Sequence, residues 1–225
     1  MDRYNSDDSK KAAGEKAVDY VKDGMVIGLG TGSTAKYFIE RLAKRIQEES
    51  LDLTAIPTSV ASENLAKRLG VKVSNLSEHP AIDLDVDGAD EVDPKYNLIK
   101  GGGGAHTREK IVASASKEFI VIVDEAKLVN RLGNFPVAVE VIPFAEGYVM
   151  KEIEGLGGIA KKRAGFVSDN GNVVLDARFN IVDPIRLEKD MNEIPGVVEN
   201  GIFAKRRPEK VIVGVGKKTK TLERE

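Results

Sequence analysis

The segment that decides the fold is Met25-Val-Ile-Gly-Leu-Gly-Thr-Gly-Ser-Thr-Ala35, in which a short apolar run passes through a glycine-rich turn. After the turn, apolar residues recur over 35–46 with the i, i+3, i+4 spacing of an amphipathic helix. Other strand-like apolar runs, at 53–57, 82–86 and 119–123, alternate with helix-period segments. This alternation predicts an α/β fold with an open, mostly parallel sheet and flanking helices, a Rossmann-like arrangement.

The order of predicted elements changes from residue 137 onward to strand, helix, strand, strand, helix, strand. Asn170-Gly171 between two strand-like runs favours a tight hairpin. Asp183-Pro184 is typical of an N-cap followed by proline at the first helical position. The βαββαβ order predicts a smaller α+β domain of the ferredoxin-like type.

Domain boundaries follow from this change of pattern. We predict an α/β catalytic domain made of residues 1–134 plus 205–225, and a ferredoxin-like domain over 135–204. The apolar run at 210–215 is expected to return to the first sheet as a strand. The charged tail at 217–225 is expected to fray.

Composition narrows the class of protein. The chain has 225 residues with 34 basic and 36 acidic side chains, and this balance argues against a nucleic-acid partner bound through a basic surface. The absence of cysteine excludes disulfides, thiol nucleophiles and Cys-ligated metals. Without an apolar leader or a run of membrane-spanning length, we expect a cytoplasmic protein with no membrane partner.

The glycine-rich turn is the first candidate for chemistry. Backbone N–H groups at a helix N-terminus attract anions, and the hydroxyls of Thr31, Ser33 and Thr34 add donors, so the expected ligand is a phosphate. Yet the G-x-G-x-G spacing matches neither the dinucleotide fingerprint nor the P-loop. Glycines in a tight turn can also serve packing alone. This segment by itself leaves both interpretations open.

The acidic stretch IDLDVDGADE is the second candidate. On a strand, Asp83, Asp85 and Asp87 share one face. They could be solvated carboxylates of an edge strand, or the start of a calcium loop, which D-x-D-x-D-G resembles. Calcium is disfavoured because Pro94 occupies the position of the bidentate glutamate. If the following turn lies at the carboxyl edge of the sheet, Asp87 and Asp90 reach the crevice where such sheets bind ligands.

The third candidate is Lys100-Gly-Gly-Gly-Gly-Ala-His-Thr-Arg-Glu109. Four glycines cost so much backbone entropy that the loop must approach something closely or need unusual dihedrals. Thr107 could cap the next helix and place Glu109 in its first turn, where an acid complements the helix dipole without any catalytic role. His106 alone is more often a hydrogen-bonded loop residue than a base.

Together the three clusters suit proton transfer on a small phosphorylated metabolite. One carboxylate would move a carbon-bound proton while a cation steadies the oxyanion. The sequence shows no Cys/His metal set, so we expect neither a metal nor another cofactor. From the residues alone, isomerisation is not distinguished from hydrolysis or deamination.

Five motifs together resemble the A-type ribose-5-phosphate isomerases. They are GLGTGSTA (28–35), DGADE (87–91), KGGGGAHTREK (100–110), DEAK (124–127) and PVAVEVIP (136–143). The resemblance extends from about Lys10 to Gly216. It implies interconversion of D-ribose 5-phosphate and D-ribulose 5-phosphate through an enediolate without metal, in the non-oxidative pentose phosphate pathway, by a homodimer or homotetramer.

The resemblance also implies residue roles. Glu109 would shuttle a proton between C2 and C1, Asp87 would assist ring opening and proton movement at the substrate oxygens, and Lys100 would hydrogen-bond the oxygen that becomes negative. Asp90 and the backbone of Gly101, Gly102 and Gly103 would complete the sugar site. Further substrate contacts would come from Lys10, Thr31, Gly32, Ser33, Thr34, Gly88, Ala89 and Lys127. His106 departs from the family pattern, since many members carry an apolar residue there.

Two other functions remain as alternatives. A sugar-phosphate deaminase or lactonase would share the phosphate-binding glycine turn, although we do not match the DGADE and KGGGGA pair to those enzymes. A non-catalytic sugar-phosphate sensor would carry a DNA-binding module, and the sequence shows no helix-turn-helix segment with a basic recognition helix.

Overall fold

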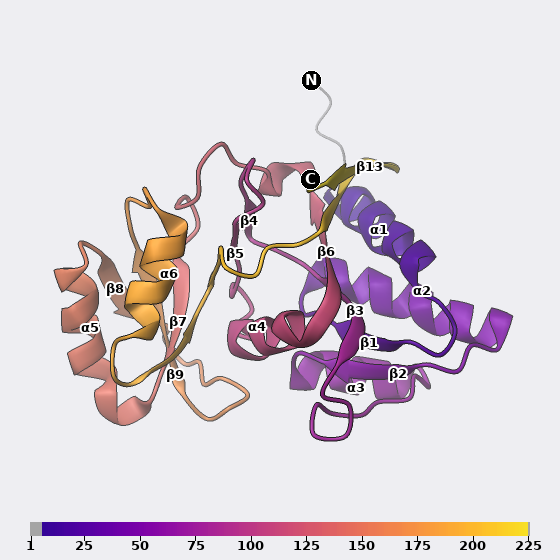
Figure 1. Cartoon of the computed structure of the whole chain (residues 1–225), viewed down its shortest axis with the longest axis horizontal. Coiled ribbons are helices and arrows are strands. Elements are labelled where there is room, and N and C mark those ends of the chain that lie inside the picture. The colour runs from indigo at the N-terminus through magenta and orange to yellow at the C-terminus, as the bar shows by residue number, and fades with distance from the viewer. Residues whose placement is uncertain (1–5, 225) are drawn as a thin grey trace. The chain divides into compact units, whose positions relative to one another are not determined.

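The computed structural model describes residues 6–224, which form two compact units (Figure 1). The first unit contains the chain up to Gly88, then Ile111–Lys127, and the chain from Pro208 onward. The second unit contains Ala89–Lys110 and Leu128–Arg207. The segment Ala89–Lys110, which the sequence prediction assigned to the first domain, thus groups with the second unit. No helix among the described residues is long and apolar enough to cross a membrane.

A six-stranded sheet organises the first unit. Its order is β13-β12-β6-β3-β1-β2, and every neighbouring pair is parallel except β12 with β13. The strands are β1 (Val26–Leu29), β2 (Thr54–Pro57), β3 (Ile82–Asp87), β6 (Ser116–Asp124), β12 (Lys210–Val215) and β13 (Lys218–Glu223). The predicted open, mostly parallel sheet is confirmed, and the 210–215 run joins it as expected.

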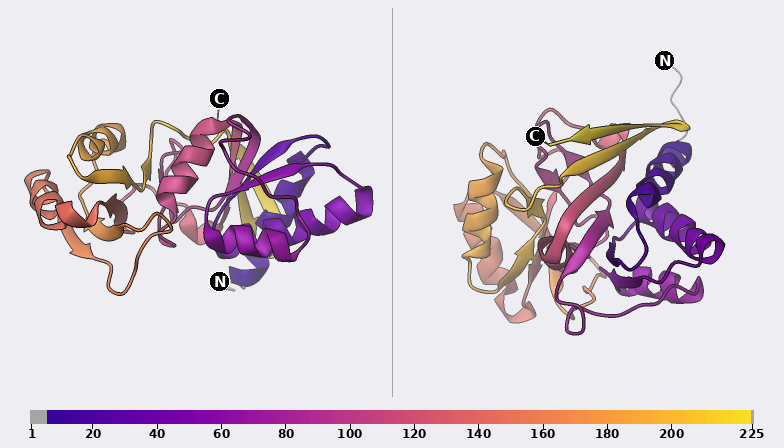
Figure 2. Two further views of the ribbon diagram at one scale, coloured as in Figure 1. Left: turned by 90° about the horizontal axis from the view of Figure 1, so that it is seen from below. Right: turned by 45° about the vertical axis from the view of Figure 1, so that its right-hand side comes forward.

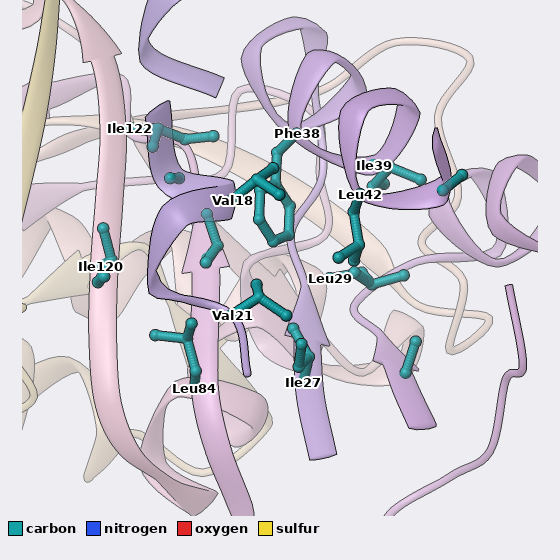
Figure 3. Packing of buried hydrophobic residues seen from close by; sticks show 14 of the residues in the cluster. Val18, Val21, Ile27, Leu29, Phe38, Ile39, Leu42, Leu84, Ile120 and Ile122 are labelled. Atoms are coloured by element: carbon teal, nitrogen blue, oxygen red, sulfur yellow. The ribbon is translucent and has the colours of Figure 1, made fainter. Parts of the chain in front are cut away.

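Helices cover this sheet because their apolar stripes match its apolar faces. They are α1 (Ser6–Ala17), η1 (Val18–Tyr20), α2 (Ser33–Glu49), α3 (Val60–Arg68) and, from Ile111 onward, α4 (His106–Ala115). The short η2 (Glu125–Lys127) follows β6 and buries no residue. Figure 2 shows the indigo and purple helices of this unit beside its strands. Phe38 and Leu42 of α2 are fully buried and belong to one core cluster with Leu29 of β1 (Figure 3). Burying one such side chain stabilises the fold by roughly 1.5–3 kcal/mol. On α4, Val112 belongs to a separate small cluster.

The strand order indicates the edge of the sheet at which a ligand is expected. In the sheet, β1 lies between β2 and β3, so the chain moves to one side of β1 to form β2 and then crosses to the other side to form β3. Ligands of open α/β sheets bind outside the carboxyl ends of the strands at such a switch point. The glycine turn follows β1, and Asp87 is the last residue of β3.

The second unit contains two antiparallel sheets. The first has the order β10-β7-β9-β8, so β7 and β9 are its central strands. Its elements are β7 (Val137–Val141), η3 (Pro143–Ala145), α5 (Glu146–Gly155), β8 (Ile159–Lys162), β9 (Val173–Arg178), α6 (Pro184–Asn192) and β10 (Val197–Asn200). This is the predicted βαββαβ order, and Asp183 caps α6 by accepting a hydrogen bond from Arg186 N. The other sheet, β11-β5-β4, consists of β4 (Glu91–Val92), β5 (Leu98–Ile99) and β11 (Ile202–Phe203).

One expectation about an exposed segment is wrong, and one of the alternatives for the acidic stretch is excluded. The tail does not fray, because β13 pairs with β12 along its whole length, from Lys218 opposite Val215 to Glu223 opposite Lys210. Its net charge obscured an alternation of lysine and threonine that suits an edge strand. The acidic strand β3 is not an edge strand either, since it lies between β6 and β1. Glu225 lies outside the described residues.

Candidate active site

The glycines of the first turn face carboxylates on the neighbouring strand. A Cβ on Gly28 would lie 2.5 Å from Asp85 Oδ1 and 2.6 Å from Val112 Cγ1, and a Cβ on Gly30 would overlap Asp87 Oδ1. Because β1 pairs with β3 with Gly28 opposite Asp85, the alternating glycines meet the alternating aspartates. Glycine is therefore required here to make room for carboxylates.

Asp87 is held by the main chain. The residue is fully buried, and its Oδ1 accepts hydrogen bonds from the N–H groups of Thr31 at 2.9 Å and Gly88 at 2.7 Å. Gly30 N donates to Val86 O at 2.9 Å, which fixes the turn to the end of β3. The carboxylate predicted to handle substrate protons is thus oriented by two backbone donors at the switch point.

The start of α2 offers donors for an anion. Gly32 precedes the helix with φ +109°, is exposed, and provides no capping side chain. The first N–H groups of a helix lack intrahelical partners and carry partial positive charge, so they attract an anion. The exposed Ser33 and half-buried Thr34 belong to this first turn.

The Thr31 side chain lies in a cluster of hydroxyl groups. Its Oγ1 is 2.8 Å from the hydroxyls of Thr58 and Ser59, and 3.2 Å from that of Ser62. Ser62 Oγ in turn donates to Gly30 O at 2.6 Å. The segment after β2 therefore supports the glycine turn. The sequence analysis did not identify these residues, although three hydroxyl residues after a predicted strand are a usable signal.

Lys10 and Lys127, which the sequence analysis predicts as further substrate contacts, both belong to the first unit. Lys10 lies one helical turn before Gly14, whose backbone packs so closely on α2 that an added Cβ would be 3.0 Å from Thr34 O. Lys127 ends η2, directly after β6. Both side chains are half-buried.

A buried ion pair is the central feature of the second unit. Lys100 Nζ is 3.3 Å from Glu109 Oε2, and the two side chains are 2% and 6% exposed. Lys100 follows β5, its N–H donates to Gly201 O at 2.8 Å, and its ammonium lies 5.5 Å from the centre of the Phe203 ring. A carboxylate and an ammonium placed together away from water can serve as base and oxyanion partner.

The glycine loop between Lys100 and Glu109 has the unusual dihedrals that its composition predicted. Gly101 has φ +107° and Gly104 φ +75°, values that side-chain-bearing residues rarely adopt. A Cβ on Gly101 would also lie 2.6 Å from Ala138 Cβ. Gly102 N donates to Asp90 Oδ2 at 2.8 Å, so Asp90 fixes the loop, while Gly103 is exposed.

The first turn of α4 differs in part from its prediction. The helix begins at His106, and Thr107 donates its hydroxyl to Glu140 Oε2 at 2.5 Å, so it is not the predicted N-cap. Glu109 does lie in the first turn. His106 is fully buried and donates from Nε2 to Glu199 O at 3.2 Å. Burial lowers the His106 pKa to about 4, so its ring is neutral near pH 7.

Lys110 anchors the other side of the same helical turn. Its ammonium lies 3.1 Å from Glu188 Oε1, 2.8 Å from Glu199 Oε1 and 4.9 Å from the centre of the Phe203 ring. Burial alone would raise the pKa of Glu199, but Lys110 and hydrogen bonds from Asn200 and Asn192 hold that pKa below its ordinary value. Lys110, which directly follows Glu109, thus stabilises the fold by pairing with two buried carboxylates.

The predicted residues fall into two groups, one in each unit. The first unit contains Lys10, Thr31, Gly32, Ser33, Thr34, Asp87, Gly88 and Lys127, and the second contains Ala89, Asp90, Lys100, Gly101, Gly102, Gly103 and Glu109. The chain passes from one group to the other between Gly88 and Ala89. Over residues 6–224, no three His, Asp or Glu side chains gather in a metal-binding arrangement. Asp83 instead pairs with Lys117 at 2.7 Å.

Comparisons with known proteins show the family to which the chain belongs. The family model for ribose 5-phosphate isomerase A, also called phosphoriboisomerase A, matches residues 54–218. A ribose-5-phosphate isomerase A from Methanothermobacter thermautotrophicus is 55% identical over 202 residues, covering 87% of this chain and 89% of that protein. One from Methanocaldococcus jannaschii is 49% identical over 98% of this chain and 100% of its own length.

Solved structures show the same similarity. The ribose 5-phosphate isomerase A of Methanocaldococcus jannaschii superposes with a TM-score of 0.94 at 49% identity, over 98% of this chain and 100% of that one. A D-ribose-5-phosphate isomerase in complex with phospho-erythronic acid also gives a TM-score of 0.94, at 44% identity and with the same coverage. With a family model over most of its length and relatives at about half identity, this chain belongs to the ribose 5-phosphate isomerase A family.

Proposed function

We propose that this protein is an aldose–ketose isomerase that interconverts D-ribose 5-phosphate and D-ribulose 5-phosphate in the non-oxidative pentose phosphate pathway. The observation that carries the proposal is the buried Lys100–Glu109 pair at 3.3 Å. Family membership narrows the substrate to a pentose phosphate, and one solved relative was determined with phospho-erythronic acid. We also propose that the protein acts in the cytoplasm.

The chemistry follows from the charges at the two groups of residues. Glu109 takes the proton from C2 of the open-chain aldose, the C–H electron pair forms the double bond of the enediolate, and the same carboxyl returns the proton to C1. Lys100 donates a hydrogen bond to the oxygen that becomes negative. Asp87 moves protons at the ring and hydroxyl oxygens, with Asp90 holding the glycine loop that completes the sugar site.

Binding of the phosphate is assigned to the first unit. The uncapped N–H groups at the start of α2 supply donors, and Ser33 and Thr34 add hydroxyls. Lys10 and Lys127 supply positive charge. Thr31 contributes by positioning, because its N–H orients Asp87 and its hydroxyl is in the cluster with Thr58 and Ser59.

A ketose-forming assay with ribose 5-phosphate tests this function. Glu109→Gln should lower turnover by at least the 10²–10⁴ typical of positioned acid–base groups. The variant loses stability because Lys100 stays buried without its carboxylate, so it is assayed below its unfolding temperature, where circular dichroism shows that it is folded. EDTA should leave the rate unchanged. Wild-type turnover in the variant would show that Glu109 only complements the dipole of α4 and is not the base. Ammonia release from glucosamine 6-phosphate, with no ketose from ribose 5-phosphate, would indicate the deaminase alternative.

We also propose that the chain forms a homodimer or homotetramer. The support is a group of exposed apolar side chains from the end of β7 into the first turn of α5 in the second unit, where Phe144 is 100% exposed, Ile142 49% and Tyr148 48%. Exposed apolar groups of this size favour burial against another subunit. Light scattering of the wild type and of Phe144→Asp tests this, because a wild-type monomer would contradict the proposed assembly.

A further inference from the structure

The start of α4 is held in place by a buried carboxylate that the proposed chemistry does not use. Glu140 lies on β7 and is fully buried. A buried charge is costly unless hydrogen bonds compensate it, so its partners show what it stabilises. We call Glu140 and the four side chains that donate to it the Glu140 cluster; the four are Thr107, Ser168, Asn170 and Asn172.

Both carboxylate oxygens of Glu140 are occupied by donors from two different segments. Thr107 Oγ1 donates to Oε2 at 2.5 Å from the first turn of α4. From the β8–β9 connection, Ser168 Oγ and Asn172 Nδ2 each donate to Oε1 at 2.8 Å. Asn170 Nδ2 lies 3.1 Å and 3.2 Å from the two oxygens. Burial raises the pKa of Glu140, but these donors together hold it below its ordinary value, so the group is charged at neutral pH.

The β8–β9 connection also contacts Arg108, the residue of α4 that follows Thr107. Arg108 donates from Nε to Asn170 Oδ1 at 2.8 Å and from a terminal nitrogen to Asp169 O at 2.9 Å. Glu140 therefore acts on the two residues that directly precede Glu109, on Thr107 by contact and on Arg108 through Asn170.

The same connection also braces the glycine loop. Arg163, beyond β8, donates to Gly101 O at 3.1 Å and to Gly102 O at 3.3 Å. Phe166 fills the space beside Gly104 so completely that a Cβ there would overlap its ring. The glycine loop after Lys100 and the first turn of α4, which carries Glu109, are therefore both held by the β8–β9 connection.

We propose that Glu140 is a positioning residue that sets the distance between Glu109 and Lys100 by fixing the first turn of α4 and the β8–β9 connection together. This rests on the proposed function for its effect on rate. A small displacement of a base costs far more in the chemical step than in substrate binding, because the reacting atoms must be closely aligned. The expected signature is a loss of kcat with little change in KM.

Glu140→Gln is the informative variant, and Val139→Ala is its matched control. Glutamine keeps the shape but turns an amide NH2 toward donors that now lack an acceptor. Val139 precedes Glu140 on β7, points to the opposite face and is fully buried in the apolar core, so its truncation lowers stability without touching the cluster. Both variants are assayed well below their unfolding temperatures.

We expect Glu140→Gln to lose about 10- to 100-fold in kcat with KM within about threefold, as for other supporting residues around a site. Val139→Ala should stay within about twofold of the wild-type kcat. Hydrogen exchange by mass spectrometry should show faster exchange of the amides over 106–110 in Glu140→Gln only. Equal kcat and equal exchange in the two variants would overturn the proposal and leave Glu140 a stability residue.

Thr107→Val keeps the proposal testable if Glu140→Gln does not fold. It removes one hydroxyl donor and preserves the side-chain shape, and we expect a smaller loss of kcat with faster exchange over 106–110. Wild-type kcat and exchange in Thr107→Val would refute the positioning role. Absence of isomerase activity in the wild type would refute the proposed function instead, and the exchange measurement would still decide whether Glu140 holds the helix.

Discussion

The two groups of candidate site residues are held by different forces. In the first unit the main chain dominates: Asp87 is fixed by two backbone N–H groups, and Gly28 and Gly30 vacate the space that carboxylates fill. In the second unit, charged side chains dominate, through the Lys100–Glu109 pair, the contacts of Lys110 and the Glu140 cluster. The first arrangement depends on shape, and the second depends on charge.

This difference predicts which substitutions each unit tolerates. A backbone hydrogen bond survives most side-chain changes, but a turn with no room for a methyl group does not survive an added one. A buried charge network tolerates small changes of shape, yet loses several kcal/mol when one partner is removed and the others stay charged.

Lys110→Met should have the largest effect on stability. Methionine preserves much of the apolar stem but leaves Glu188 and Glu199 without their cation, which should lower the free energy of unfolding by about 3–5 kcal/mol. Lys117→Met, at a side chain that is 73% exposed and paired with Asp83 in the first unit, should cost less than about 1 kcal/mol. Urea denaturation of both variants measures the contrast, and similar small losses would show that charge does not hold the second unit.

Gly30→Ala tests the shape-dependent unit. The added Cβ would overlap Asp87 Oδ1, so we expect a loss of about 3 kcal/mol in stability together with reduced isomerase activity. Gly88→Ala is the control, since a Cβ there would meet Thr31 O at 3.8 Å and Ile122 O at 3.9 Å, both ordinary contacts. Comparable thermal unfolding of the two variants would mean that the turn relaxes freely and that shape is not what holds Asp87.

His106→Leu should make the free energy of unfolding less sensitive to acid. The folded-state pKa of about 4 lies below the ordinary 6.5, so the unfolded chain binds the extra proton first. The free energy of unfolding therefore falls as the pH drops from 6.5 toward 4, by about 3 kcal/mol in total from this group. The groups that act on the ring are Glu140, Glu199 and Lys110.

Leucine at position 106 removes this contribution. Urea denaturation at pH 7 and pH 4.5 should show a smaller acid-induced loss in His106→Leu than in the wild type. Identical losses would contradict the assignment of acid sensitivity to the buried ring.

Local periodicity accounts for the parts of the fold that the sequence predicts well. The strand, turn and helix around Gly28–Thr34 have matching propensity and apolar spacing, and the βαββαβ order of the second unit is marked by Asn170-Gly171 and Asp183-Pro184. The shared face of Asp85 and Asp87 is equally local, since side chains alternate along a strand.

The parts that sequence reasoning missed depend on partners far away in the chain. The reason for Gly28 appears only once β1 pairs with β3, because Asp85 comes 57 residues later. Glu140 stands in an apolar strand, where a carboxylate looks misplaced until donors from α4 and the β8–β9 connection surround it. Local sequence predicts Thr107 as an N-cap because its actual acceptor, Glu140, is 33 residues away in the chain.

The C-terminal strand has a consequence for handling the protein. β13 pairs with the edge of β12, whose Val211, Ile212 and Val213 are buried apolar residues. In β13 itself, the lysines at alternate positions, Lys218 and Lys220, are exposed. A chain shortened after Gly216 would expose a β-branched edge that other molecules can pair with, which is the composition that seeds intermolecular sheets. We therefore expect truncated or proteolysed preparations to aggregate before the glycine turn after β1 unfolds.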